Sequence, residues 1–362
     1  MPDFTLKTYQ KLMQSVVDAP ILTFESFIQN PHQYGIILRH DVDRRPEYAL
    51  AMAQLEAEYG IRGTYYFRIV PESFQPHIIR QIAELGHEIG YHYEDVDWVV
   101  RSRKYGVSRK QVLSDKVSSR KKVSSVKERV VGSRKYGESR KTVLSRNKVS
   151  SFKETEKFEK ELADRGIESF ERNLAKMREV ADIRTICMHG SPLSKWDNRL
   201  LWDYYDYREL GLLGEPYFDI DWSEVFYLTD TGRSWDNRTV SVRDKVFSET
   251  VGSKKYGKSR KKVSSVKERV GREKYEESRR KVSSVKEKVG SKEYVVGSGN
   301  KNLRFRRTGD IVQAIEDGWF PDKAMMTVHP QRWTNSVLPW IKELFLQNIK
   351  NVVKRALVRR KF

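Results

Sequence analysis

The sequence has a single cysteine and only 11 prolines among 362 residues. One cysteine excludes an internal disulfide, so a disulfide scaffold is ruled out. No run of residues approaches the roughly 18 consecutive uncharged apolar positions of a membrane span, and residues 1–16 lack the basic start and apolar middle of a signal peptide. We therefore expect no membrane span and a cytoplasmic protein. Hydrophobic residues make up 38% of the chain and aromatic residues 11%, which is enough for a globular core.

Acidic residues are scarce in two segments, and these segments account for the net charge of +20. Residues 101–153 hold 18 basic and 3 acidic residues, and residues 251–302 hold 17 basic and 6 acidic residues. The other 257 residues hold 34 basic and 40 acidic residues, so the body of the chain is mildly acidic.

The two basic segments are built from one repeat. Residues 253–271 read SKKYGKSRKKVSSVKERVG and residues 272–290 read REKYEESRRKVSSVKEKVG, while KKVSSVKERV also begins at Lys121. Each unit has four apolar residues on one helical stripe, too few to offset the entropy of ordering the chain. We interpret the segments as low-complexity insertions in two surface loops of an older domain. An arm for nucleic acid or another polyanion is the less favoured alternative, because each unit has only one aromatic residue.

Outside the insertions the chain has about the length of one (β/α) barrel, roughly 250 residues. Short apolar runs alternate with helical patterns there, which predicts a mainly parallel sheet in an α/β fold. The predicted strands are 35–41, 64–70, 87–93, 183–189, 217–222, 225–229 and 324–329. The predicted helices are 46–59, 76–85, 167–180, 310–317 and 338–357. The barrel would comprise residues 1–100, 154–250 and 303–362, interrupted by the insertions 101–153 and 251–302.

Histidine or aspartate stands at the end of four predicted strands. These residues are Asp41 with Asp43, His92, His189 and His329. Because the carboxyl ends of parallel strands lie along one edge of the sheet, we expect these side chains to converge on one site.

Strand alternation separates these candidates from their neighbours. Asp41 and Asp43 share one side of an extended strand with Arg39, whereas His40 faces the other side. Two carboxylates therefore face the expected site, and we interpret His40 as structural.

The same alternation applies to the next strand and to the cysteine. His87 and His92 are separated by an odd number of residues, so only one of them faces the site, and His92 is nearer the strand end. We interpret His87 as structural. Cys187 lies inside the strand 183–189, and we expect it to be a small core residue.

These motifs resemble the polysaccharide deacetylases, the NodB-homology group of metal-dependent glycan N-deacetylases, in an atypical branch. Residues 38–43 (LRHDVD) are similar to the first motif of that family, and residues 86–92 (GHEIGYH) to the approach to its second. Residues 327–330 (TVHP) resemble the final motif, and residues 188–192 (MHGSP) stand where the family lines its groove. The resemblance implies a distorted (β/α) barrel.

The resemblance also implies roles for the strand-end residues. Asp41 would be the general base and His329 the general acid, while Asp43 and His92 would bind a divalent metal, which we expect to be zinc. The family has neighbouring aspartates, whereas Val42 separates them here, so the roles of Asp41 and Asp43 could be reversed.

The third metal ligand departs from the family pattern. The usual second histidine would fall at Val96. His189 and Glu94 could replace it, and we favour His189 because imidazole suits zinc and a neighbouring strand end can supply it. Loss of the metal site is the remaining alternative.

The resemblance implies a hydrolase that removes an N-acyl group, expected to be acetyl, from an amino sugar of a glycan or glycan precursor. Arg39, Trp196, Arg332 and Trp333 offer the hydrogen-bond donors and aromatic faces that suit a carbohydrate substrate. Two alternatives from other classes are a barrel that binds saccharide without turnover and a polyanion-binding protein that acts through the repeats.

Overall fold

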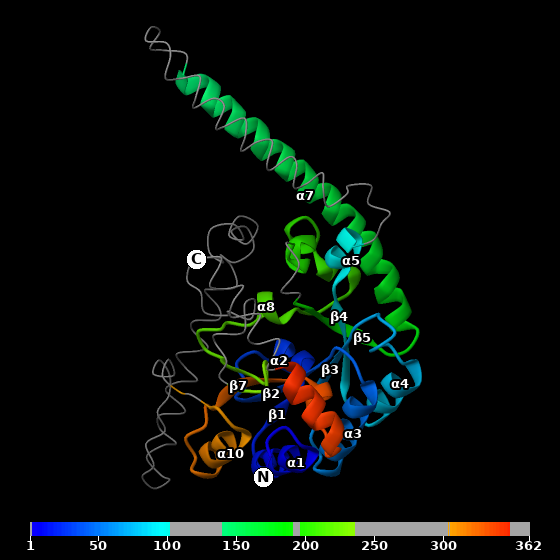
Figure 1. Ribbon diagram of the computed structural model, residues 1–362, viewed down its shortest axis with the longest axis vertical. Helices are drawn as coiled ribbons and strands as arrows, with labels where there is room; N and C mark the ends of the chain where they lie inside the picture. Colours follow the sequence, from blue (N-terminus) through cyan, green and yellow to red (C-terminus); the bar gives the residue numbers. More distant parts are fainter. Residues whose placement is uncertain (1, 102–139, 191–195, 236–302, 304, 348–362) are drawn as a thin grey trace. The chain divides into compact units, whose positions relative to one another are not determined.

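The computed structural model describes residues 2–101, 140–190, 196–235, 303 and 305–347 (Figure 1). The chain divides into two compact units. The first comprises Met1–His92, Val180–Cys187 and Leu212–Phe362, and the second comprises Tyr93–Glu179 and Met188–Gly211. The insertions 101–153 and 251–302 lie outside the described residues, apart from residue 101 and residues 140–153.

A parallel sheet organises the first unit (Figure 1). Its strands are β1 (Ile21–Leu22), β2 (Gly35–Val42), β3 (Thr64–Phe67), β4 (Glu88–Tyr93), β5 (Ile183–Met188), β6 (Phe226–Thr229) and β7 (Lys323–Val328). Their order is β5-β4-β3-β2-β7-β6, and β1 pairs with β2. The pairs of β2 with β1, β3 and β7 are parallel, as are the pairs β3–β4 and β6–β7. This confirms the predicted parallel α/β sheet, while its closure into a barrel stays a prediction.

Helices accompany the strands. They are α1 (Leu6–Val16), α2 (Phe24–Gln29), α3 (Pro46–Glu58), α4 (Pro76–Glu84), α5 (Asp95–Arg101), α7 (Arg140–Arg178), α8 (Pro216–Asp219) and α10 (Thr308–Glu316). Short 3-10 turns cover Asn198–Asp203, Tyr207–Leu210 and Pro330–Arg332. A further helix spans residues 337–347. Among the described residues, no helix combines the length and apolar character that a membrane crossing requires.

Apolar side chains cover both faces of the sheet. Ile36 and Leu38 of β2 pack in one cluster with residues of α1 and α10, two helices that lie side by side (Figure 1). Ile37, which alternates to the opposite face, packs in a second cluster with Phe24 and Phe27 of α2. Burial on both faces is typical of a parallel sheet and explains why β2 reads as one apolar run.

Local sequence signals set the ends of α3 and α4. Each helix has proline at its first position, where the fixed φ of proline suits the first turn. Gly60 and Gly86 follow their ends with φ of 69° and 88°, a left-handed conformation that glycine adopts without strain. The predictions for 46–59 and 76–85 are confirmed.

Two predicted elements differ from the structure. Residues 217–222 were expected to form a strand, but Tyr217 lies in α8, because Pro216 occupies the first turn and the Glu215 side chain accepts from the main-chain nitrogen of Tyr217. The helix predicted over 167–180 begins much earlier, since α7 starts at Arg140 within the first insertion. The helix predicted over 338–357 is present over 337–347, and the rest of it lies outside the described residues.

Candidate active site

Asp41 is held by an arginine two residues earlier on the same face of β2. Arg39 donates from Nε to Asp41 Oδ1 at 2.8 Å and from Nη2 to Oδ2 at 2.7 Å, and both side chains are buried. Burial by itself raises the pKa of Asp41, but the Arg39 guanidinium outweighs it and lowers that pKa, with His92 and His329 acting in the same direction. Asp41 is therefore an ionised and oriented carboxylate at neutral pH.

Asp43 follows directly after β2 and is half-buried. Gln331 donates from Nε2 to Asp43 Oδ2 at 2.9 Å, and Arg68 donates from Nη1 to the main-chain oxygen of Asp43 at 3.3 Å. The contact with Gln331 joins the end of β2 to the segment that follows β7. A second carboxylate thus lies in the same region as Asp41, as strand alternation predicts.

His92 directs one ring nitrogen toward these carboxylates. Its Nδ1 lies 2.9 Å from the main-chain oxygen of Cys187, which can only accept, so Nδ1 carries the hydrogen. Nε2 lies 3.8 Å from Asp41 Oδ2 and 3.7 Å from Asp43 Oδ1. Two atoms that each bind one zinc ion at about 2.1 Å are at most roughly 4.2 Å apart. These separations therefore allow a shared divalent ion, and a backbone partner on the other ring nitrogen is usual for a metal-binding histidine.

Cys187 lies beside this group. Its Sγ and the ligand atoms of Asp41 and His92 all lie within 4.8 Å of one another, so the three residues could hold a metal ion. Cys187 is also fully buried and packs in the cluster that contains Phe24 and Ile37, as expected of a core residue. The sequence interpretation did not anticipate its place near the carboxylates, although its position near the end of β5 is the signal used for the other candidates.

His329 forms a pair with a residue that the sequence analysis missed. His329 Nδ1 lies 2.6 Å from Asp230 Oδ1, and the main-chain nitrogen of His329 donates to Asp230 Oδ2 at 3.0 Å. A carboxylate can only accept, so Nδ1 carries the hydrogen, and Nε2 is the nitrogen available for proton exchange. Asp230 follows β6 directly, so the strand-end rule could have found it.

Asp230 is a fully buried carboxylate that accepts hydrogen bonds from three residues of the segment after β7. Arg332 donates from Nη1 to Oδ1 at 2.5 Å, and Trp333 donates from Nε1 to Oδ2 at 2.9 Å. Burial raises the pKa of Asp230, but the charges of Arg332 and His329 and the hydrogen bonds from His329 outweigh it, which lowers the pKa to about 2. Asp230 is therefore a permanent anion that orients the His329 ring.

Three of the predicted substrate contacts donate hydrogen bonds to carboxylates of the site. The guanidinium of Arg39, a residue that is 2% exposed, forms a salt bridge with Asp41. The guanidinium of Arg332 forms a salt bridge with Asp230. Trp333 is fully buried, so its indole has no open face on which a sugar ring could stack. Each of these side chains contacts a strand-end carboxylate from within the protein, and their role as substrate contacts stays a prediction.

Two other predicted residues belong to the second unit. His189 is half-buried, donates from its main-chain nitrogen to the main-chain oxygen of Tyr93 at 2.8 Å, and accepts from Asn198 Nδ2 at 3.0 Å through its main-chain oxygen. Trp196 is half-buried, with its ring 5.5 Å from that of Phe158. Their roles as metal ligand and substrate contact stay predictions.

His40 and His87 have the structural role that alternation indicates. His40 Nε2 lies 2.9 Å from Oε1 of the buried Glu56, and His87 Nδ1 lies 3.6 Å from Oε2 of the same carboxylate. Tyr9 donates to Glu56 Oε1 at 2.5 Å. This network lies on the face of β2 opposite to Asp41, so it belongs to the packing of the sheet.

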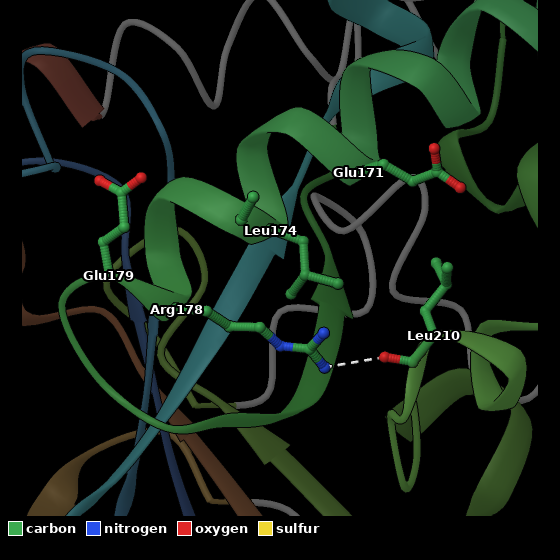
Figure 2. A pocket seen from close by; sticks show the side chains of 6 residues that line it. Glu171, Leu174, Arg178, Glu179 and Leu210 are labelled. Atoms are coloured by element: carbon green, nitrogen blue, oxygen red, sulfur yellow. Dashed lines mark hydrogen bonds between the residues drawn. The ribbon is translucent and has the colours of Figure 1, made fainter.

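The second unit contains a pocket of about 540 Å³ on α7. Arg178 reaches from α7 to the main-chain oxygen of Leu210, to which it donates at 2.8 Å (Figure 2). Glu171, Leu174, Ala175 and Glu179 complete the lining. No strand-end candidate lines this pocket, so it is a separate feature.

Comparison with known proteins adds no relative. No protein-family model matches the chain. Neither the curated proteins nor the solved structures contain a match.

Proposed function

We propose that the chain is a metal-dependent hydrolase that removes an N-acyl group, acetyl, from an amino sugar of a glycan or glycan precursor. One observation supports this proposal above all. The strand ends of the first unit hold both a set of residues that could bind a metal and a pair of residues that could transfer a proton. Asp41, Asp43 and His92 form a carboxylate and imidazole set, and His329 with Asp230 forms a proton-transfer pair. The motif resemblance supports the same reaction and a distorted (β/α) barrel of the polysaccharide deacetylase type.

The donor set fits a divalent ion such as zinc. Asp43 and His92 are the ligands that the motifs indicate, and their ligand atoms lie 3.7 Å apart. His189 remains the third ligand of the sequence-based proposal, and Cys187 is the competing donor because its Sγ lies near Asp41 and His92. A bound ion would polarise the amide carbonyl and acidify a water molecule.

The chain's own residues would move the protons. Asp41 is ionised and held in place by Arg39. It would accept a proton from the attacking water while the water oxygen bonds to the acyl carbon. The bond from the acyl carbon to the sugar nitrogen then breaks, and His329 delivers a proton to that nitrogen from Nε2. Asp230 keeps the ring oriented by accepting from Nδ1. The products are a free carboxylate and an amino sugar.

Metal content and acetate release test the proposal together. Purified protein should contain close to one zinc or similar ion per chain and release acetate from N-acetylated saccharides. His92→Ala should lose the ion, whereas His329→Ala should keep it and lose about 100-fold or more in kcat. His77→Ala is the matched control, since His77 is exposed on α4 and should retain both properties.

The third ligand is tested by a pair of variants. His189→Ala should lose the ion, and Cys187→Ala should keep it because Cys187 packs in an apolar cluster. Loss of the ion in Cys187→Ala, with the ion kept in His189→Ala, would identify the Cys187 thiol as the third ligand. Protein without metal that binds saccharides but never releases acetate would overturn the hydrolase and support a saccharide-binding barrel.

A further inference from the structure

The helix over residues 337–347, red in Figure 1, contacts the first unit through its polar side chains. Trp340 donates from Nε1 to the main-chain oxygen of Asp3 at 2.9 Å. Glu343 accepts from Arg44 Nη2 at 2.6 Å, and Gln347 is buried. The spacing of three and four residues places Trp340, Glu343 and Gln347 on one face of the helix. This face holds the helix in place.

The opposite face of the helix is apolar and exposed. Val337 is 68% exposed, Leu338 80%, Ile341 51% and Phe345 66%. Leu338, Ile341 and Phe345 are three and four residues apart, so they form a continuous stripe. A helix on a protein surface ordinarily turns such an apolar stripe toward the core. In this helix the polar face contacts the protein and the apolar stripe is exposed. A contiguous exposed apolar surface of this kind marks an interaction site.

The sequence that follows indicates the chemistry of the partner. Residues 348–362 contain six basic residues and no acidic one. Within that sequence Ile349, Val352 and Ala356 continue the spacing of four, three and four residues from Phe345. Glu343, the acidic residue nearest to this sequence, is already paired with Arg44. Apolar residues combined with an excess of basic residues in the sequence are complementary to an anionic and amphipathic surface.

We propose that the apolar face of helix 337–347 docks onto a membrane surface rich in anionic phospholipid. The exposed apolar side chains of this face would enter the boundary between headgroups and acyl chains, and anionic lipid would complement the positive charge of the sequence that follows. The helix would lie in the plane of the interface, since its 11 residues are far shorter than the roughly 20 of a membrane-spanning helix. A second copy of the chain is a poorer partner, because each copy would bring six positive charges to the contact.

Vesicle flotation tests the proposal with the full chain. The protein should float with phosphatidylcholine vesicles that contain about 30% phosphatidylglycerol, less with phosphatidylcholine alone, and less at high salt. The triple variant Leu338→Glu, Ile341→Glu and Phe345→Glu should lose at least about tenfold in affinity for the anionic vesicles, because it removes the inserted apolar groups. Its acetate release from a soluble saccharide should equal that of the wild type.

A matched triple variant controls for charge. Val17→Glu, Tyr34→Glu and Trp98→Glu introduce the same three negative charges at exposed apolar residues elsewhere. This control should bind vesicles within about twofold of the wild type. The wild type and both triple variants keep the basic insertions, so the insertions cannot account for a difference between them. Circular dichroism and thermal unfolding establish that both variants are folded.

Several outcomes would overturn the proposal. Equal losses in the two triple variants would mean that charge alone drives binding. No flotation of the wild type with anionic vesicles would exclude the membrane surface. A wild-type dimer in solution that Leu338→Glu, Ile341→Glu and Phe345→Glu converts to a monomer, without vesicle binding, would assign the face to self-association.

Discussion

In the proposed reaction Asp230 would act through His329, so replacing Asp230 would separate the orientation of His329 from metal binding. Asp230→Asn keeps the size of the side chain but removes its charge, and the amide can present a donor where Nδ1 needs an acceptor. We expect kcat for acetate release to fall about 100-fold or more, with the metal content unchanged. Asp182→Asn, at an exposed position, is the control. A loss of metal in Asp230→Asn would show that Asp230 does not act mainly on His329.

The same carboxylate predicts a pH dependence of stability. The pKa of Asp230 is lowered from 3.8 to about 2 by Arg332 and His329 against the effect of burial. A lowered pKa stabilises the fold above the unfolded pKa, so this contribution, about 2 kcal/mol, is complete above pH 5 and lost as the pH falls toward 2.

Urea unfolding of the wild type and Asp230→Asn measures this contribution. The difference in the free energy of unfolding between the two proteins should be largest at neutral pH and should shrink between pH 5 and pH 2. A difference that stays constant over that range would contradict the predicted linkage.

Single residues were predictable where one physical rule acted alone. The rule that polar residues end buried parallel strands found Asp41, His92 and His329, and it would have found Asp230 if every strand had been treated alike. The role of Arg39 could not be predicted in this way. Strand alternation predicts the face of β2 on which Arg39 lies, but not the group to which it donates hydrogen bonds. The nearest carboxylate on that side, Asp41, accepts hydrogen bonds from Nε and Nη2 of Arg39.

At the scale of elements, a buried polar network joins α1 and α3 to β2. Tyr9 of α1 and His40 of β2 both bond to Glu56 of α3. Burial raises the pKa of Glu56, but His40, His87 and Tyr9 outweigh it and lower that pKa. The carboxylate is therefore ionised in the core and depends on its donors.

Tyr9→Phe tests how much this network contributes. The variant removes one donor from a fully buried carboxylate, which should cost about 1–3 kcal/mol in the free energy of unfolding at neutral pH. Tyr34→Phe, at a residue that is 61% exposed, should change that free energy by less than about 0.5 kcal/mol. Acetate release should be unaffected, because Tyr9 lies on the face of the sheet away from Asp41. Equal stability of Tyr9→Phe and the wild type would contradict this account.

Elements were predictable where the pattern and the capping signals agreed. Pro46 and Pro76 begin helices and glycines follow their ends, so both helices could be located from the sequence. Residues 217–222 alternate like a strand, but the local effect of Pro216 and the Glu215 side chain prevails over that weak periodicity. The start of α7 was missed because residues 140–153 have the composition of the basic repeats and only a narrow apolar stripe.

At the scale of the whole molecule, the excess of positive charge and the residues of the hydrophobic core belong to different parts of the sequence. The insertions hold the excess of basic residues, whereas the remaining 257 residues hold more acidic than basic residues. Binding to a polyanion weakens with salt in proportion to the number of charges that contact it. Affinity for heparin should therefore depend on the insertions, and metal binding and turnover on the rest.

Replacing residues 251–302 by a glycine-serine linker of equal length tests this division. The variant loses 17 basic and 6 acidic residues, so it should elute from heparin at a lower salt concentration than the wild type. Zinc content and acetate release should be retained, because the repeats have too few apolar residues to form part of a core. An unfolded variant, or one without metal, would mean that the second insertion supports the fold and that the separation of charge from core is wrong.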